Sequence, residues 1–136
     1  MPAKSIQFIT YPEVSLLDLA GPLDVFMAAN HFAHPDHPPY SFSILALSPT
    51  TEILSNLSLN AEVLAAHTSP AHTLIVPGGP GIHAFCEHPK FFTHFVSHAE
   101  KSKRLVSVCT GIFALATAGK LKGRSVTTHW LSLIHI

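Results

Sequence analysis

Charged residues are scarce in this sequence, and their positive and negative charges cancel. Only 12% of the 136 residues are charged, and eight Lys and Arg balance eight Asp and Glu. A chain without net positive charge does not attract nucleic acid or anionic membrane, so we expect any DNA contact to come from a separate domain. No apolar run approaches the roughly 20 residues that cross a bilayer, and residues 1–9 lack the pattern of a signal peptide. We therefore expect a cytoplasmic protein without a membrane partner.

Cysteine is rare, and Cys86 and Cys109 lie in unrelated contexts without the spacing of metal ligands. This excludes a disulfide framework and indicates no zinc site. Histidine, by contrast, occurs 11 times, and His31, His34 and His37 recur at every third position. A metal-binding tract is one interpretation. The intervening prolines break the helix that would gather these imidazoles on one face, so we predict a solvated loop, no metal site and no cofactor.

The sequence does contain an alternation of short apolar strands and helices, within the length of one domain. Strands are predicted at residues 5–10, 40–47, 73–76 and 104–108, with one or two in 53–61 and another beginning in 125–128. A helix is predicted in the apolar stretch between Leu16 and the His/Pro loop, with Pro22 in its first turn and Asp18 just before it. Further helices are predicted at 90–103 and at 111–118. Such alternation favours an α/β fold with a parallel, doubly wound sheet, in which reactive groups gather beyond the carboxyl ends of the strands.

Cys109 is the strongest candidate for chemistry. It follows the apolar run 105–108 and opens a predicted helix, and Ser107 replaces the first glycine of a G-x-nucleophile-x-G pattern that ends at Gly111. This is the geometry of a nucleophile elbow, in which the helix N-terminus stabilises a thiolate. The alternative is an inert, buried cysteine. Cys86 has no evident partner, so we interpret it as a packing residue.

Five other residues could complete a site around this thiol. The turn at Gly78 and Gly79 ends a neighbouring strand and can offer backbone N–H groups to an oxyanion. Asp18 can exchange protons with the thiol, or it can simply cap a helix. Thr110 can supply a hydroxyl or be only the first helical residue. His129 can act as a base or imidazolium partner, or be structural.

Gly79, Gly81 and Ala84 also fit the G-x-G-x-x-A fingerprint of dinucleotide-binding proteins. Two points oppose this interpretation. The predicted helix does not start tightly at this turn, and Glu100 lies within a helical stripe and not at the end of the next strand. We therefore predict that this turn binds no nucleotide.

Three blocks of the sequence resemble the ThiJ/PfpI branch of the class I glutamine amidotransferase-like superfamily. They are LLDLAGPLDVFMAAN at 16–30, TLIVPGGPG at 73–81 and VSVCTGIFALATAGKLKGRSVTTHW at 106–130. The resemblance implies a flavodoxin-like domain over residues 1–130, with helices on both faces of a mainly parallel sheet. It also implies that Cys109 is the elbow residue, that Asp18 faces it, and that Gly78 and Gly79 form the oxyanion hole. We also expect a homodimer.

Within this branch, residues 18–30 most resemble AraC-type transcriptional regulators, which carry this domain at the N-terminus as a sensor of a small ligand and bind DNA through a C-terminal helix-turn-helix pair. This is the function that we expect first. Isocyanide hydratases share Asp18, Cys109, Thr110 and the Thr-Thr-His-Trp block at 127–130. In them the thiolate adds to the isocyanide carbon and the carboxylate handles protons, so an enzyme of this kind would be a cofactor-independent lyase that forms N-formamides.

Other functions fit the resemblance less well. Proteases and deglycases of the superfamily have a glutamate where this sequence has Asp18. A structural or chaperone-like role is the third candidate.

The end of the sequence departs from the resemblance. The family's domain continues for a helix, a strand and a helix beyond the Thr-His-Trp block, so we expect a fold that is incomplete at the C-terminus. Residues 131–136 (LSLIHI) match the translation of the transposase mosaic-end adapter used in DNA library preparation. We therefore predict that these residues are a non-native read-through tail.

Overall fold

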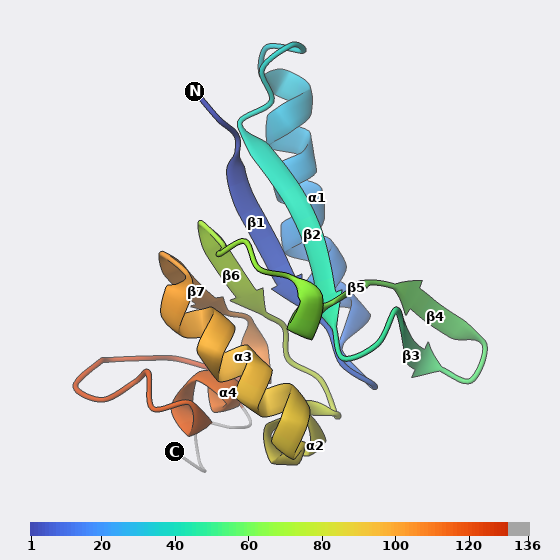
Figure 1. Ribbon diagram of the computed structural model, residues 1–136, viewed down its shortest axis with the longest axis vertical. Coiled ribbons are helices and arrows are strands. Elements are labelled where there is room, and N and C mark those ends of the chain that lie inside the picture. Colours follow the sequence, from blue (N-terminus) through green and yellow to red (C-terminus); the bar gives the residue numbers. More distant parts are fainter. Residues whose placement is uncertain (131–136) are drawn as a thin grey trace.

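Five short parallel strands form the central sheet of the computed structural model, which describes residues 1–130 (Figure 1). The strands are β1 (Lys4–Ile9), β2 (Tyr40–Ala46), β5 (Glu62–Val63), β6 (Thr73–Val76) and β7 (Arg104–Ser107). Their order in space is β5-β2-β1-β6-β7, so the chain winds outward from β1 in both directions. This confirms the predicted doubly wound sheet, and it places the topological switch point at the carboxyl ends of β1 and β6.

Helices cover both faces of the sheet, as predicted (Figure 1). On one face lies α1 (Leu16–Phe32), where Leu19 packs against Phe8 and Ile75. The opposite face carries α2 (Ile82–Glu87), α3 (Pro89–Lys101), α4 (Ile112–Thr117) and the 3₁₀ turns η1 (Leu64–Ala66) and η2 (Cys109–Gly111). Because side chains alternate along a strand, Phe8 belongs to the first core and Ile9 to the second.

Phe85 stands at the centre of the second core. It is 3% exposed, stacks on Tyr11 with ring centroids 5.1 Å apart, and meets Phe91 and Phe95 edge-on at 4.8 Å and 5.4 Å. Aromatic rings favour such edge-on and stacked contacts because of their quadrupoles. The cluster ties α2 and α3 to the strand end at Tyr11, directly beneath the turn that follows β6.

The structure corrects the predicted start of α1. The helix begins at Leu16, so Asp18 lies in its first turn and not before it, and Pro22 lies inside the helix and not in its first turn. Ser15 sets this start: its backbone is extended, and its N–H donates to the carbonyl oxygen of Gly78 at 2.8 Å. Since proline has no N–H, the carbonyl of Asp18 lacks its usual donor four residues on.

The segment predicted to hold one or two strands forms a hairpin outside the main sheet. It consists of β3 (Thr50–Leu54) and β4 (Leu57–Asn60), paired antiparallel, with an irregular register between Glu52 and Leu54. The first strand begins three residues earlier than the sequence indicated. The hairpin projects from one side of the molecule, away from the α2–α4 layer (Figure 1).

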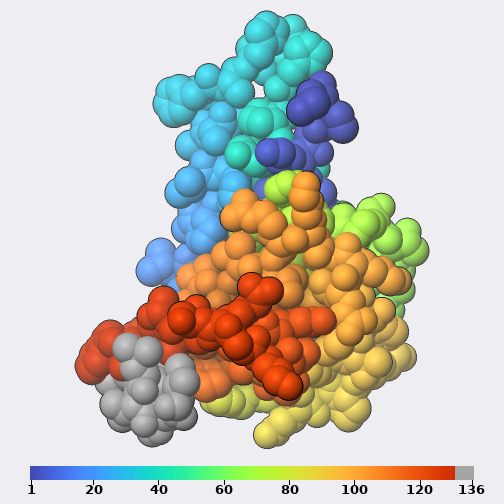
Figure 2. Space-filling model, turned by 90° about the vertical axis from the view of Figure 1, so that its left-hand side faces the viewer, coloured from blue at the N-terminus to red at the C-terminus, as the bar shows by residue number. Residues whose placement is uncertain are grey.

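The strand predicted in 125–128 is wrong. These residues are irregular, and the segment after α4 lies across the molecular surface beside β7 (Figure 2, red). A groove of about 840 Å³ lies between them, lined on one side by Arg104 and on the other by Arg124. Val126 is the only apolar side chain in residues 125–128 and is 40% exposed, so pairing of these residues with β7 would bury little apolar area to offset the lost chain entropy.

The histidine tract is only partly a loop. His31 lies in the last turn of α1, whereas His34 and His37 lie in the exposed loop that follows, with ring centroids 5.6 Å apart. Within residues 1–130, no group of three or more His, Cys, Asp or Glu side chains is arranged to hold a metal ion. None of the helices described is both long and apolar enough to cross a membrane.

Candidate functional site

The connection between β7 and α4 is the sharp turn predicted for Cys109. The N–H of Val108 donates to the carbonyl oxygen of Val76 at 3.0 Å, which keeps the chain beside β6 up to the elbow. Cys109 then takes a φ of 52°, in the left-handed region that costs a non-glycine residue roughly 1–2 kcal/mol. The turn η2 and helix α4 follow, and Gly119 ends the helix with a φ of 74°, as predicted. The elbow is therefore present.

Asp18 and Thr110 meet at the turn that follows β6. The N–H of Gly78 donates to Oδ2 of Asp18 at 3.2 Å, and the N–H of Gly79 donates to Oγ1 of Thr110 at 3.0 Å. A Cβ on Gly78 would lie 2.5 Å from Oγ1 of Thr110 and 3.0 Å from Oδ2 of Asp18. Helix α1, the glycine turn and the elbow thus converge on one point at the carboxyl edge of the sheet.

This arrangement gives the two glycine amides a use that the sequence did not indicate. Gly78 and Gly79 were predicted to turn their N–H groups toward an oxyanion, but both N–H groups donate to side chains of the protein itself. They hold a carboxylate and a hydroxyl in place. Their role as oxyanion donors stays a prediction, and it requires a ligand that displaces Asp18 or Thr110.

The glycines also let this turn pack closely against the loop that precedes α1. Gly79 has a φ of 146°, and a Cβ there would overlap the backbone N of Ser15. A Cβ on Gly81 would overlap the carbonyl oxygen of Pro12, and the N–H of Gly81 donates to the carbonyl oxygen of Glu13 at 3.3 Å. These glycines therefore make room for protein backbone.

One of the two arguments against a dinucleotide site, that no helix starts tightly at this turn, is wrong. A helix does start at this turn, because α2 begins at Ile82, directly after Gly81. The short helix escaped prediction because six residues are too few to show a helical period. The other reason holds, since Glu100 lies within α3.

Tyr11 supports the glycine turn from the core. Its ring is fully buried, and its hydroxyl donates to the carbonyl oxygen of Pro77 at 2.6 Å. Burial raises the pKa of Tyr11 far above its usual value, and the charges of Asp18, Cys86 and Cys109 raise it further. The hydroxyl therefore remains a hydrogen-bond donor throughout the neutral pH range.

Replacing this hydroxyl tests how firmly the turn is held. Tyr11→Phe should lower the free energy of unfolding by roughly 1–3 kcal/mol, because the buried carbonyl of Pro77 loses its donor. Urea unfolding followed by circular dichroism measures the change. Tyr40→Phe is the control, since the ring of Tyr40 is half-buried and packs edge-on against Phe26 at 4.9 Å. Equal losses in the two variants would show that the bond to Pro77 has no special weight.

Thr128 is a residue of the site that the sequence pattern did not indicate. Its hydroxyl donates to the carbonyl oxygen of Cys109 at 2.8 Å, which fastens the chain after α4 to the elbow. The only signal for it was its place in the Thr-Thr-His-Trp block. The neighbouring His129 stacks on Trp130, with ring centroids 5.7 Å apart, and its proposed role toward the thiol stays a prediction.

Cys86 lies where a packing residue is expected. It is half-buried on α2 against the second core. Burial raises the pKa of its thiol, so less of it is in the reactive thiolate form.

The structure is thus an α/β protein with a doubly wound sheet and a cysteine in a sharp strand-to-helix turn at the carboxyl edge of that sheet. The chain belongs to the DJ-1/PfpI family, whose profile matches residues 4–134. Residues 131–136, predicted to be a read-through tail, lie outside the residues that the structure describes.

Similar proteins differ in function. The chain is 36% identical to a protein of the cpoL 5′ region of Streptomyces lividans, over 90% of this chain and 84% of that protein. It is 33% identical to the isonitrile hydratase of Pseudomonas putida, over 94% of this chain and 53% of the hydratase. It is 29% identical to the HTH-type transcriptional regulator GbdR of Pseudomonas aeruginosa, over 93% of this chain and 34% of the regulator. The chain thus spans about half the length of the hydratase and a third of that of GbdR.

Solved structures share the fold. A ThiJ/PfpI family protein from Pseudomonas syringae superposes with a TM-score of 0.80 at 24% identity, over 96% of this chain and 52% of that one. An AraC family transcriptional regulator from Pseudomonas putida superposes with a TM-score of 0.71 at 20% identity, over 97% of this chain and 70% of that one.

Proposed function

We propose that this chain is the ligand-sensing domain of an AraC-type transcriptional regulator, in which a separate helix-turn-helix domain binds DNA. The match to GbdR supports this proposal, because it covers nearly all of this chain but a third of the regulator, as expected when one domain of several is shared. The zero net charge is consistent with it, since the chain carries no excess of basic residues for a phosphate backbone.

The main support for the proposal is that the backbone N–H groups of Gly78 and Gly79 both donate to side chains of the protein itself. The bond from Gly78 to Asp18 ties the start of the 17-residue helix α1 to the turn after β6, and the bond from Gly79 to Thr110 ties the elbow to the same turn. A ligand that accepts from either amide would release one of these ties. A ligand on the Gly78 amide would change how α1 is anchored, and one on the Gly79 amide would change how the elbow is anchored, which gives a sensor two arrangements with different ligand affinity.

The experiment that tests this proposal is to sequence the gene from intact genomic DNA through codon 130 and onward. We expect a reading frame that completes this domain and adds two basic helix-turn-helix units. A stop codon soon after the end of the domain would contradict the regulator and favour an enzyme that acts alone. The same sequence tests whether codons 131–136 belong to the gene.

A hydratase-like lyase is the second candidate, favoured by the meeting of Asp18 with Thr110, the residue after the elbow cysteine, at the Gly78–Gly79 turn. In such a reaction the thiolate of Cys109 adds to the isocyanide carbon, and that carbon takes up a proton. Water then adds to the same carbon and the thiolate leaves, which gives the N-formamide. Asp18 would pass the protons between water and substrate. The two amides would first have to give up their internal bonds to stabilise developing charge.

A further inference from the structure

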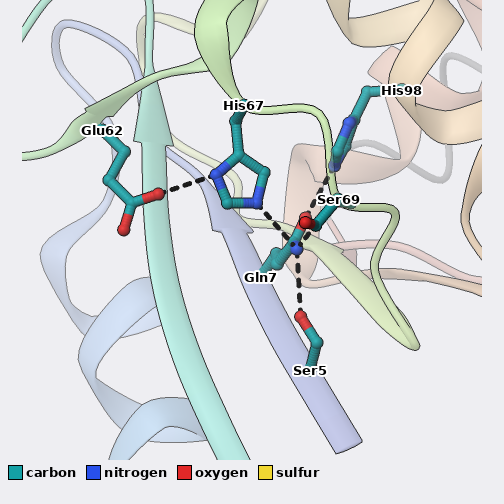
Figure 3. Close-up of polar contacts among 6 residues, drawn as sticks. All are labelled: Ser5, Gln7, Glu62, His67, Ser69 and His98. Atoms are coloured by element: carbon teal, nitrogen blue, oxygen red, sulfur yellow. Dashed lines mark hydrogen bonds and ion pairs between the residues drawn. The ribbon is translucent and has the colours of Figure 1, made fainter.

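A network of polar side chains, most of them buried or half-buried, lies beneath α3, on the face of the sheet opposite α1 (Figure 3). Its centre is Gln7 of β1, which is 1% exposed. Oε1 of Gln7 lies 2.6 Å from Nε2 of His98, and Nε2 of Gln7 lies 3.1 Å from Nε2 of His67. On the other side of its ring, Nδ1 of His67 lies 2.7 Å from a carboxylate oxygen of Glu62.

The directions of these bonds fix the position of each imidazole proton. An amide NH₂ can only donate, so Nε2 of His67 accepts and its proton lies on Nδ1, from which it donates to Glu62. An amide oxygen can only accept, so His98 carries its proton on Nε2. This orientation of the Gln7 amide is therefore compatible with one neutral tautomer of each ring.

We propose that Gln7, His67 and His98 form a two-state proton switch, in which protonation of His67 turns over the Gln7 amide and changes the tautomer of His98. If Nε2 of His67 takes up a proton from solvent, that nitrogen becomes a donor and faces the NH₂ group of Gln7, which is also a donor. A half-turn of the amide brings Oε1 to that proton and turns the NH₂ toward His98. Nε2 of His98 must then accept, so it gives its proton to water while Nδ1 takes one up.

The charged groups around the two rings assign the added proton to His67. Glu62 of β5 lies against that ring, whereas His98 is 6% exposed. Burial lowers the pKa of His98, and positive charge on His67 and Lys101 lowers it further. His94 and Lys101 of α3 line the same pocket of about 160 Å³ as both rings, so positive charge on this helix opposes a second proton. The network therefore takes up one proton and not two.

The switch acts on the loop that precedes β6. The two N–H groups of Gln7 are shared among three acceptors, since Nε2 of Gln7 also lies 3.2 Å from the carbonyl oxygen of Ser69 and 3.0 Å from the hydroxyl oxygen of Ser5. Turning the amide removes the donor to the carbonyl oxygen of Ser69, whereas the hydroxyl of Ser5 can donate to Oε1 instead. The loop around Ser69 therefore loses an anchor, while His98 keeps its bond to Gln7. Mild acid would thus loosen this loop and leave α3 docked on the sheet.

The test is an NMR titration of the ring nitrogens in the 136-residue chain with ¹⁵N-labelled histidine, from about pH 8 to about pH 5. At the upper limit we expect His67 protonated on Nδ1 and His98 on Nε2. As His67 becomes charged, His98 should change to the Nδ1 tautomer with the same midpoint. An unchanged tautomer of His98, or separate midpoints for the two changes, would overturn the proposal.

A variant tests the part played by the amide. In Gln7→Glu the carboxylate accepts from both rings without turning, so His98 should keep its proton on Nε2 throughout the titration. His37→Gln removes an exposed loop imidazole and should leave the coupled change intact. If His98 still changes tautomer in Gln7→Glu, the amide is not the switch. Should that variant fail to fold, the titration of the unaltered chain alone decides.

Discussion

Gly111→Ala is expected to lower the free energy of unfolding by roughly 3 kcal/mol or to prevent folding altogether. A Cβ at Gly111 would overlap the carbonyl oxygen of Val76, and it would lie 2.9 Å from the carbonyl carbon of Val76 and 3.1 Å from that of Pro77. These are backbone atoms at the end of a buried strand, so no side-chain rotation relieves the overlap. Urea unfolding and the yield of folded protein measure the effect.

Gly21→Ala is the matched control. Gly21 lies inside α1, and a Cβ there would meet no atom within 4 Å. Since alanine is favoured over glycine in a helix by about 0.8–1 kcal/mol, this variant should be more stable than the unaltered chain. If Gly111→Ala unfolded at the same urea concentration as Gly21→Ala, the contact between the elbow and β6 would be looser than the structure shows.

Cys109→Ala is expected to remove rapid labelling by iodoacetamide, and any conversion of an alkyl isocyanide to its N-formamide, while the fold stays intact. The remaining thiol, Cys86, is half-buried with a raised pKa and should label slowly. Mass spectrometry of the adducts and chromatography of the formamide measure both outcomes. Unchanged turnover would remove Cys109 from the mechanism. For a pure sensor we expect no turnover before or after the change.

Two further variants serve as controls for the thiol. Cys86→Ala should keep the rapid labelling at Cys109. Cys109→Gly removes the same thiol as Cys109→Ala but also relieves the left-handed backbone, whose φ is 52°. It should therefore be more stable than Cys109→Ala by about 1 kcal/mol. Equal stability of these two variants would mean that the elbow stores no backbone strain.

Local pattern was sufficient to predict four of the five strands of the sheet and the elbow, but not β5, whose two residues are too few to show a strand pattern. The run at 73–76 was predicted to the residue, because a fully buried strand reads as a continuous apolar segment. The meeting of Asp18, Gly78 and Thr110 followed from the rule that parallel strands end at the same edge of a sheet. The partners of the hydrogen bonds donated by Gly78 and Gly79 could not be predicted in this way, since these bonds join residues 60 and 31 positions apart.

Other features depend on contacts that no local pattern contains. Gln7 interrupts an apolar strand, but its partners His67 and His98 are 60 and 91 positions away. The segment at 125–128 has β-type composition, yet it is irregular, because a strand forms only where pairing with the edge of a sheet also buries enough apolar area. The composition of the segment alone does not show how much apolar area such pairing would bury.

The crowding around Gly78 sets a rule for protein engineering. A library that randomises this site in search of new reactivity would lose every member with a side chain at position 78, since a Cβ there would lie 2.5 Å from the Thr110 hydroxyl oxygen and 2.6 Å from the Thr110 backbone nitrogen. Diversity is better introduced at Asp18 and Thr110, whose side chains bound the same space from two different elements. Position 78 should therefore be kept as glycine while the residues around it are varied.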